Sequence, residues 1–326
     1  MKAAVIDALG HTPVCREVEE PSAPEGWVVG RVRAAAIKNI ERMLAAGTHY
    51  GSGHMALPAQ IGLDAVVEIP DGHRVYTGAT PPAGAMAERM AVNPAQVIEV
   101  PTSVDDAVAA ALPNAAISAW FALEYAGQIQ TGQSVLVLGA TGVTGGLAVQ
   151  LATQQFGADH VVAVGRDEAR LEQLRTRGAD NVIRIDNEAT GLADAVRALH
   201  AEHPFDLVLD YLWGSPAEQT LRALANDDLA ATFHRTRFVQ IGETAGPTLT
   251  LPASVMRSAG IELVGQGGGS VPREAFGRVM TEILPALFDM LSAGTLTLET
   301  RTMPLDQVES AWTQATASGE RMVIIP

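Results

Sequence analysis

The strongest constraint on the fold of this chain is an alternation of apolar and helical segments that runs from Ser134 to Gly265. The apolar segments are rich in Val, Ile and Leu and predict strands at Ser134–Leu138, His160–Val164, Asn181–Ile185, Phe205–Asp210, Arg237–Ile241 and Ile261–Gly265. Helical patterns lie between them, at Gly145–Phe156, Glu168–Arg177, Ala189–His200 and Pro216–Ala225. Because these strands are apolar on both faces, the pattern predicts a doubly wound parallel sheet of the α/β class.

The first third of the chain has the texture of a small β-barrel or sandwich. Short segments rich in Val, Ile and Ala are separated by Gly, Pro and Asp turns, as in "KAAVID", "WVVGRVRAAAI", "IGLDAVVEI", "HRVYTG" and "AERMAV". One short helix, "NIERMLAA", is expected to begin with Asn39 as its N-cap, to carry Glu41 in its first turn and to stop at Gly47.

The segments on either side of the alternating region differ from it again. A helical stretch precedes it, with Ser103 as a candidate cap and Pro113 as a break. A helix closed by Gly294 follows it, in "REAFGRVMTEILPALFDMLSAG". Next come a strand around Glu299–Arg301, a helix around Leu305–Ala317 and a last strand, "RMVIIP". The most economical architecture inserts residues 119–266 into a substrate domain built from residues 1–118 and 267–326.

The charge balance and the cysteine count exclude several classes of function. The 22 basic and 37 acidic residues give a net charge of -15, which disfavours nucleic acids and anionic membranes as partners. Cys15 is the one cysteine of the sequence, so an internal disulfide and a cysteine-rich zinc site are excluded. The longest run without charge, Tyr125–Ala158, changes periodicity along its length, so we interpret it as a buried strand, turn and helix rather than a membrane span. The start "MKAAVIDALG" lacks the pattern of a signal peptide, so we expect a cytoplasmic location.

A glycine-rich turn joins the first strand of the alternating region to its helix, in "VLVLGATGVTGG". Its spacing, G-x-x-G-x-x-G, is related to the dinucleotide fingerprint G-x-G-x-x-G. Such a turn can serve packing alone. Within a strand–helix alternation it favours a pyrophosphate site, because glycines allow close approach and the free N–H groups at a helix start attract anionic oxygens. The loop residues assigned to this site are Gly139, Thr141, Gly142, Val143 and Thr144.

The end of the next strand indicates which dinucleotide would bind. NAD sites usually place Asp or Glu there, whereas "VVAVGRDEAR" places Gly165 and Arg166 at that point and Arg170 four residues later. Arginine suits a 2′-phosphate, so the sequence favours NADP. Asp167 and Glu168 are expected in the first helical turn, facing solvent. The alternative is that both arginines are ordinary surface charges.

With these features, the chain resembles the medium-chain dehydrogenase/reductases, and among them the zinc-independent quinone oxidoreductases. The resemblance rests on "AAAIKNIERMLAAG", "DGHRVY", "GAMAERMAV", "ALPNAAISAWFAL", "GQSVLVLGATGVTGGLAVQLA", "LRTRGADNVIRID" and "RMVIIP". It implies a Rossmann domain inserted into a GroES-like β-barrel substrate domain. It also implies that Asn114 and Ser118 lie near the nicotinamide and its ribose, and we assign Ile241, Gly242 and Gly267 to the cofactor site.

Two departures from the family pattern bear on chemistry. Where zinc alcohol dehydrogenases of this superfamily carry a Cys ligand and Gly-His-Glu, this chain has Lys38 and "GLD", with Leu63 and Asp64. Neither Lys nor Leu can replace those zinc ligands at neutral pH, so we expect no catalytic metal. Quinone reductases of the family usually carry Asn and Asp where this chain has Lys38 and Glu41, and Tyr where it has Met86.

Without a metal, a positioned cation or hydroxyl must stabilise charge on the substrate oxygen. Lys38 stands where the resemblance places the zinc, so its ammonium is a candidate for that role or for donating a proton. The alternative is that Lys38 pairs with Glu41 or Asp64 and only orders the loop. Tyr50 is a candidate hydrogen-bond donor to the substrate, or else a packing tyrosine. The candidate catalytic residues are thus Lys38, Tyr50 and Asp64.

These features predict an NADPH-dependent, zinc-independent reductase of quinones or of alkenes conjugated to a carbonyl. The resemblance implies a homodimer, for which the strand Ile261–Gly265 would provide an exposed sheet edge. Three alternatives stay open: an enoyl-thioester reductase, a zinc alcohol dehydrogenase, and an NADPH-binding sensor without turnover.

Overall fold

The computed structural model describes residues 1–49, 51–226, 228, 230 and 232–326. The chain forms two units, which we call the terminal unit (Met1–Asn114 and Gly277–Pro326) and the central unit (Ala115–Phe276). The chain crosses between them at Asn114/Ala115 and at Phe276/Gly277, and not at 118/119 and 266/267 as the sequence texture indicated. Both crossings lie inside helices, where the residue pattern does not change.

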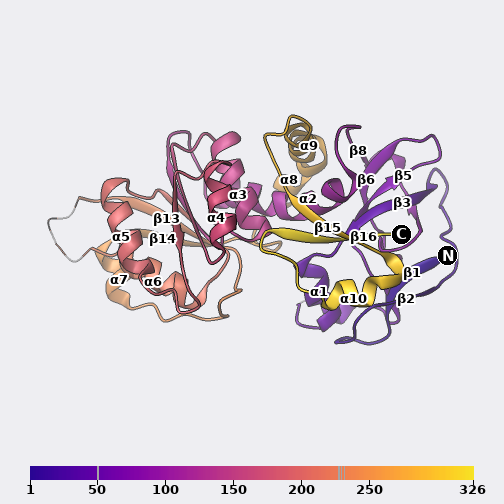
Figure 1. Cartoon of the computed structure of the whole chain (residues 1–326), viewed down its shortest axis with the longest axis horizontal. Coiled ribbons are helices and arrows are strands. Elements are labelled where there is room, and N and C mark those ends of the chain that lie inside the picture. The colour runs from indigo at the N-terminus through magenta and orange to yellow at the C-terminus, as the bar shows by residue number, and fades with distance from the viewer. Residues whose placement is uncertain (50, 227, 229, 231) are drawn as a thin grey trace. The chain divides into compact units, whose positions relative to one another are not determined.

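The central unit is built on a parallel sheet (Figure 1). Its strands are β9 (Ser134–Leu138), β10 (His160–Gly165), β11 (Asn181–Arg184), β12 (Leu207–Asp210), β13 (Arg235–Gln240) and β14 (Gly260–Gly265). Their order within the described residues is β11-β10-β9-β12-β13-β14, with parallel pairing throughout. This is the doubly wound order, and it confirms the predicted sheet.

Helices cover both faces of this sheet. They are α3 (Val143–Gln154), α4 (Glu168–Arg175), α5 (Leu192–Glu202), α6 (Gly214–Leu224) and α7 (Ala253–Ser258). Helices α3 and α4 contact each other, while α6 contacts both α5 and α7 on the other face (Figure 1). Side chains such as Leu136, Val162 and Phe238 are fully buried in the core between the sheet and the α5–α6 layer. Within the charge-free run 125–158, β9 and α3 form the strand and helix expected there.

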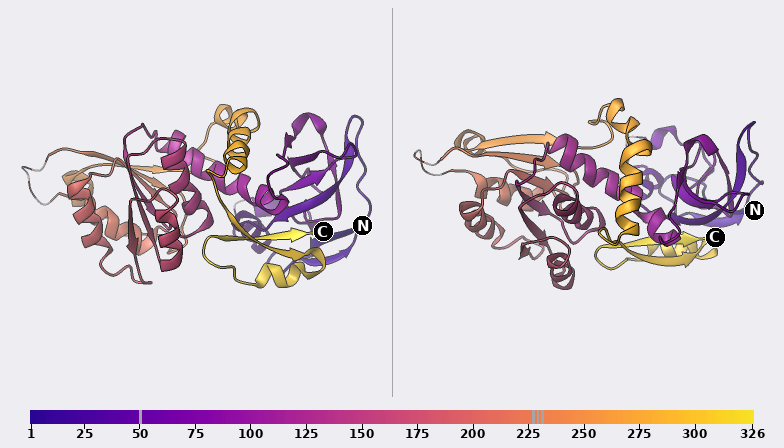
Figure 2. Two further views of the ribbon diagram at one scale, coloured as in Figure 1. Left: turned by 45° about the horizontal axis from the view of Figure 1, so that its top comes forward. Right: turned by 90° about the horizontal axis from the view of Figure 1, so that it is seen from above.

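The terminal unit consists of mainly antiparallel sheets, which the end of the chain completes with one parallel pair of strands. Its strands are β1 (Lys2–Ile6), β2 (Val14–Glu17), β3 (Val28–Ala36), β4 (Ala59–Gln60), β5 (Asp64–Glu68), β6 (Arg74–Gly78), β7 (Arg89–Val92), β8 (Ile98–Glu99), β15 (Glu299–Pro304) and β16 (Glu320–Ile325). One sheet has the order β2-β1-β4, and the other runs β15-β16-β3-β5-β6-β8 with β7 paired to β3. The C-terminal strand β16 lies beside the N-terminal strand β3 in every view (Figures 1 and 2).

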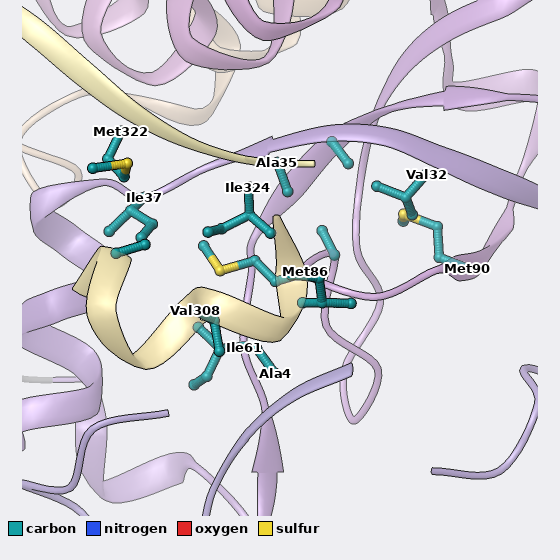
Figure 3. Close-up of a cluster of buried hydrophobic side chains, with 14 of the residues drawn as sticks. Ala4, Val32, Ala35, Ile37, Ile61, Met86, Met90, Val308, Met322 and Ile324 are labelled. Carbon is teal, nitrogen blue, oxygen red and sulfur yellow. The ribbon is translucent and has the colours of Figure 1, made fainter. Parts of the chain in front are cut away.

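The core of the terminal unit gathers side chains from both ends of the chain (Figure 3). Ile37 and Val32 lie in the same cluster as Met322 and Ile324. Met86, which replaces the family's tyrosine, is fully buried in this cluster. Its side chain therefore belongs to the core and does not line a substrate surface.

Short helices complete the terminal unit. They are α1 (Asn39–Ala46), η1 (Ser52–His54), η2 (Pro94–Gln96), α8 (Arg273–Gly277, which begins in the central unit), η4 (Val279–Ile283), α9 (Leu284–Ser292), η5 (Leu305–Gln307) and α10 (Val308–Thr313). The helix predicted as one piece up to Gly294 is thus divided by the π-turn η4, although Gly294 closes it in the left-handed conformation (φ 72°).

Helix α2 (Asp106–Phe121), continued by the π-turn η3 (Ala122–Ala126), corrects two expectations. Pro113 lies inside the helix and does not break it, because buried neighbours on all sides override the local cost of proline. Asp105, not Ser103, caps the helix: its carboxylate accepts the backbone N–H groups of Ala107 and Val108 at 2.9 and 3.2 Å. The hydroxyl of Ser103 instead lies 2.6 Å from that of Ser292.

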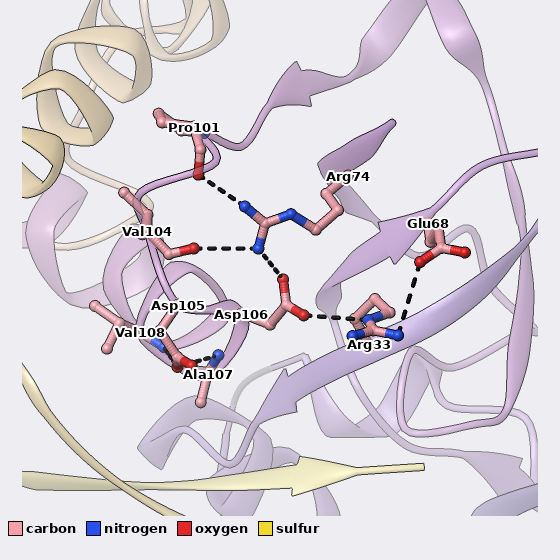
Figure 4. Close-up of polar contacts among 9 residues, drawn as sticks. All are labelled: Arg33, Glu68, Arg74, Pro101, Val104, Asp105, Asp106, Ala107 and Val108. Carbon is pink, nitrogen blue, oxygen red and sulfur yellow. Dashed lines mark hydrogen bonds and ion pairs between the residues drawn. The ribbon is translucent and has the colours of Figure 1, made fainter. Parts of the chain in front are cut away.

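The start of α2 is fixed to the antiparallel sheet by two arginines (Figure 4). Arg74 on β6 donates to the Asp106 carboxylate at 2.7 Å and to the carbonyl of Pro101 at 2.8 Å. Arg33 on β3 donates to the other oxygen of Asp106 at 3.1 Å. The stretch Asp106–Ala126 is long and apolar enough to cross a bilayer, but 72% of its most apolar window is buried inside the protein, as is usual for a core helix.

Candidate functional site

The carboxyl edge of the parallel sheet carries the predicted glycine-rich loop. Gly139 follows β9 directly and has φ +84°, which turns the chain away from the strand. A Cβ on Gly145 would lie only 2.4 Å from the carbonyl oxygen of Gly139, so glycine is required there for α3 to pack against the turn. The loop lies between β9 and β12, where the direction of strand succession reverses, which is where open α/β sheets bind ligands.

The first turn of α3 presents backbone N–H groups to a ligand. Gly142 is exposed at the N-cap and has no side chain with which to cap the helix, and Val143 and Thr144 are half-buried behind it. The first N–H groups of a helix have no intrahelical acceptor, so they can bind anionic oxygens. Thr141 is 8% exposed and fills the space beside Gly165, where a Cβ would lie 2.3 Å from its methyl group. Gly165 therefore allows the loop and β10 to pack closely.

The two arginines proposed for a 2′-phosphate lie in different environments. Arg166 is exposed at the end of β10 and donates to the side chain of Asn187 at 3.0 Å. Arg170 is 4% exposed on α4 and donates to Gln173 at 2.8 Å. The structure thus does not bring them together on one exposed face. Asp167 is the N-cap of α4 and not a first-turn residue: its carboxylate accepts the backbone N–H of Arg170 at 2.9 Å.

The other predicted cofactor residues lie at several places. Ile241 and Gly242 follow β13, and both donate backbone N–H groups to the carbonyl of Asp210, at 2.8 and 3.1 Å. Gly267 is exposed after β14. Asn114 is exposed and Ser118 half-buried one turn later on α2, and within the described ranges neither side chain makes a hydrogen bond. Tyr50 lies outside the described residues.

The terminal unit contains a buried ion cluster, which we define as Lys38, Glu41 and Asp64. The Nζ of Lys38 lies 2.8 Å from Asp64 Oδ1 and 3.1 Å from Glu41 Oε1. The Lys38 side chain is 0% exposed, and those of Glu41 and Asp64 are 2% and 12% exposed. Lysine and glutamate are almost never fully buried unless they are paired, and here each carries a partner.

Glu41 is the centre of this cluster and also shapes the backbone around it. Its carboxylate accepts the backbone N–H of Lys38 at 2.8 Å and that of Leu63 at 2.9 Å. Lys38 is therefore the N-cap of α1 in a capping box with Glu41, where the sequence had indicated Asn39 as the cap. Glu41, at the third position of α1, hydrogen-bonds back to the backbone N–H of Lys38. The start of α1 is therefore fixed by the contacts of Lys38 and Glu41.

Electrostatics fix the charge state of the ion cluster. Burial alone would lower the pKa of Lys38, but the carboxylates of Asp64 and Glu41 outweigh it and hold that pKa above its ordinary value. Burial, with Asp64 beside it, holds the pKa of the Tyr76 hydroxyl far above its usual range. Arg321 is 8% exposed nearby, and burial lowers its pKa. Lys38 is thus a cation at neutral pH, enclosed by its partners.

This geometry favours the ordering role of Lys38 over the proton-donating one. Its ammonium is fully buried and held by two carboxylates, so no face of it is open to a substrate. Leu63 stands where the zinc enzymes have a histidine ligand. Its side chain is 40% exposed, and its backbone N–H donates to Glu41. Among the described residues, no group of three or more His, Cys, Asp or Glu side chains is placed to hold a metal ion.

The sequence pattern did not single out Asp210, at the carboxyl end of β12. It is 0% exposed, and burial raises its pKa to about 6 although two backbone N–H groups hydrogen-bond to it. A single aspartate ending the apolar strand "LVLD" was a usable signal, since a buried charge at the carboxyl edge of a parallel sheet needs a reason.

Comparisons with known proteins give a consistent result. The model of the family described as "Zinc-binding dehydrogenase" matches residues 143–282. The chain is 30% identical to the mitochondrial NAD(P)H oxidoreductase RTN4IP1 of Bos taurus over 69% of its own length and 62% of that protein's. It is 26% identical to the "Probable NADPH-dependent quinone reductase tdiC" of Emericella nidulans over the full length of both. The chain thus spans about three fifths of the bovine relative and all of the fungal one.

Solved structures agree with these sequence relatives. The quinone oxidoreductase of Thermus thermophilus, solved also in complex with NADPH, superimposes with a TM-score of 0.80 at 26% identity and covers 100% of both chains. A probable oxidoreductase from Mycobacterium abscessus gives a TM-score of 0.78 at 26% identity. The fold, with its Rossmann sheet and antiparallel GroES-like unit, therefore matches the expected one. The comparisons thus support a protein of the medium-chain dehydrogenase/reductase superfamily that is similar to quinone oxidoreductases over its full length.

Proposed function

We propose that this protein is an NADPH-dependent, zinc-independent oxidoreductase that transfers hydride to a quinone or to an alkene conjugated to a carbonyl. The observation that carries the proposal is the glycine-rich loop, which opens α3 at the point where the order of the parallel strands reverses. The names of the relatives support it, since they include an NADPH-dependent quinone reductase and NAD(P)H oxidoreductases.

The preference for NADPH rests on the end of β10. Gly165 and the exposed Arg166 stand there in place of a carboxylate, and an arginine can pair with a 2′-phosphate through two parallel hydrogen bonds. Asp167 does not oppose this through a free carboxylate, because that group caps α4. Arg170 contributes by fixing α4 and not by direct contact, because its side chain is buried.

Bound NADPH would supply a hydride, and together with one proton the hydride reduces the acceptor while the nicotinamide is oxidised. The start of α3 would hold the diphosphate through the N–H groups of Val143 and Thr144. The ion cluster around Lys38 would hold α1 and the backbone at Leu63 in fixed positions, without supplying the proton. Tyr50 remains our candidate for hydrogen bonding to the acceptor oxygen.

Zinc-independence follows from the donor set. Lys38, whose ammonium is held by two carboxylates, and Leu63 occupy the positions at which the superfamily's zinc enzymes have a thiolate and an imidazole. We further infer a cytoplasmic homodimer. In its support, β14 ends the parallel sheet, and Leu263 on it is 40% exposed.

A fluorescence titration of the full chain with NADPH and NADH tests the cofactor. The expected result is tighter binding of NADPH, with the preference lost in Arg166→Ala. Arg175→Ala, which removes an arginine from the last turn of α4, is the matched control and should keep the preference. Equal binding of both nucleotides by the wild-type protein would remove Arg166 from the phosphate site and leave the dinucleotide loop in place.

Turnover with a panel of acceptors tests the reaction. NADPH oxidation by quinones or enones supports the proposal, and consumption of an enoyl thioester alone would assign the protein to thioester reduction. Tight NADPH binding with no oxidation by any acceptor would identify a sensor. Activity that disappears on chelation and returns with zinc would contradict the zinc-independent mechanism.

A further inference from the structure

Asp210 lies beside the candidate dinucleotide loop but plays no part in the function proposed above. It ends β12, and it is paired in register with Leu138 of β9, the residue that precedes the loop, and with Gln240 of β13. Neighbouring strands lie about 5 Å apart, so its backbone is within that distance of the loop's first residues. Its position is the crevice of a doubly wound sheet.

One carboxylate oxygen of Asp210 holds a tight turn. Oδ1 accepts the backbone N–H of Leu212 at 2.9 Å and that of Trp213 at 3.0 Å. Trp213 has φ 57° and ψ -159°, a backbone conformation that residues other than glycine rarely adopt. Gly214 follows at φ 55°. Such a conformation persists only where surrounding bonds impose it, and the carboxylate supplies two of them.

This turn forms one wall of the glycine-rich loop. A Cβ placed on Gly139 would lie 3.0 Å from Leu212 Cδ2 and 3.3 Å from Tyr211 Cβ, so the loop rests directly on the turn. The carbonyl of Leu212 also accepts the backbone N–H of Ala245 at 2.8 Å, which ties the turn to the segment after β13. A change in the turn therefore moves the loop that we assign to the diphosphate.

The second carboxylate oxygen of Asp210 does not take part in holding this turn. Oδ2 is buried and has no hydrogen-bond partner in the part of the chain that the structure describes. Its surroundings contain few charges: within the described residues, β9 has no titratable side chain, Tyr211 is buried with its pKa raised, and Glu243 after β13 is exposed. Burial raises the pKa of Asp210 to about 6, so the group gains a proton just below neutral pH.

We propose that Asp210 is a positioning residue of the dinucleotide site: its carboxylate holds the turn Tyr211–Gly214 against Gly139, and it takes up a proton when the dinucleotide binds. The inference rests on the proposed function, since it needs an anionic ligand at the loop. A diphosphate brought close to a buried carboxylate disfavours its charged form, and the free oxygen is the place where a proton can bind.

Binding of NADP⁺, which is stable in acid, is measured by calorimetry between pH 5 and 8 for the wild-type protein and Asp210→Asn. The asparagine keeps an acceptor for the two N–H groups but cannot titrate. If the diphosphate raises the pKa of Asp210 by one unit, the wild-type Kd rises about tenfold relative to that of Asp210→Asn across this range. The ligand's own titration cancels in this ratio. Near pH 6.5, wild type should take up more protons than the variant on binding, in buffers of different ionisation enthalpy.

Two further variants separate the roles. Asp210→Ala removes the acceptor and should weaken binding at every pH, while Glu243→Gln removes a carboxylate at the same sheet edge and should follow the wild-type pH profile. A constant ratio between wild type and Asp210→Asn refutes the proton uptake, and an Asp210→Ala protein that binds like wild type refutes the positioning. If wild type binds neither NADP⁺ nor NAD⁺, the dinucleotide proposal itself fails, and that result is distinct from both.

Discussion

Replacing Lys38 by methionine tests how the ion cluster supports the terminal unit. Methionine fills similar space, so the main change is the loss of a cation that lies 2.8 Å from Asp64 and 3.1 Å from Glu41. Both carboxylates then remain buried without their partner. Breaking a buried pair in this way costs about 3–5 kcal/mol, which for a unit of this size lowers the melting temperature by about 6–20 °C.

The pH dependence of the loss identifies its cause. The pKa of Lys38 is raised in the folded state from an ordinary value of 10.5, so its contribution is complete below pH 10.5 and is lost only as the pH rises through the folded-state value. Wild type therefore has the full contribution at pH 8. The deficit in unfolding free energy of Lys38→Met should therefore be full at pH 8 and shrink only as the pH rises above 10.5.

Urea unfolding followed by circular dichroism at several pH values measures this deficit. Lys2→Met, which removes an exposed lysine on β1, should change the unfolding free energy by no more than about 0.5 kcal/mol. Adding Glu41→Gln and Asp64→Asn to Lys38→Met should recover part of the loss by removing the stranded charges. A Lys38→Met protein within about 1 kcal/mol of wild type at pH 8 would refute the view that Lys38 holds this region together.

Three other predictions concern the histidines, the loop and the core. Burial and His234 lower the pKa of His200 from 6.5 to about 4, so the unfolded state binds the proton first and stability falls from pH 6.5 towards pH 4; His200→Gln should flatten that loss in thermal scans. Gly145→Ala brings a Cβ to 2.4 Å from the Gly139 carbonyl and should weaken NADPH binding more than tenfold in a fluorescence titration, despite alanine's helix propensity. Met86→Ala removes a fully buried core side chain and should cost about 2–5 kcal/mol in urea unfolding, with unchanged cofactor affinity.

The local parts of this fold could be predicted from the sequence. The strand at Ser134–Leu138 has the expected bounds, and Gly139 makes the tight turn expected after it, because a strand, a turn and a helix start are encoded by neighbouring residues. The environment of His200, before β12, could not be predicted from the sequence. His200 is half-buried at the end of the predicted helix and accepts the backbone N–H of Phe205 at 3.0 Å, a contact that a helical pattern does not encode. The ring of His234, which packs edge to face against it, is remote in sequence.

The site depends on contacts that no local pattern encodes. Lys38 joins the carboxylates of Glu41 and Asp64, and only folding shows that Glu41 also accepts the backbone N–H of Leu63. Arg170 follows Arg166 by four residues, but its side chain is buried in the packing between α4 and α3, where it lies near Gly146.

The pairing of β16 with β3 has a consequence for folding during synthesis on the ribosome. Val323 pairs with Ala36, a separation of 323 − 36 = 287 residues. At about 5–20 residues per second, roughly 15–60 s pass between synthesis of the two strands. Throughout that time the nascent N-terminal segment holds an open strand edge and an incomplete core, while the whole central unit emerges and can fold. Synthesis of the terminal unit therefore begins first and is completed last. During this interval its open strand edge and apolar core are exposed to aggregation, which a chaperone would prevent.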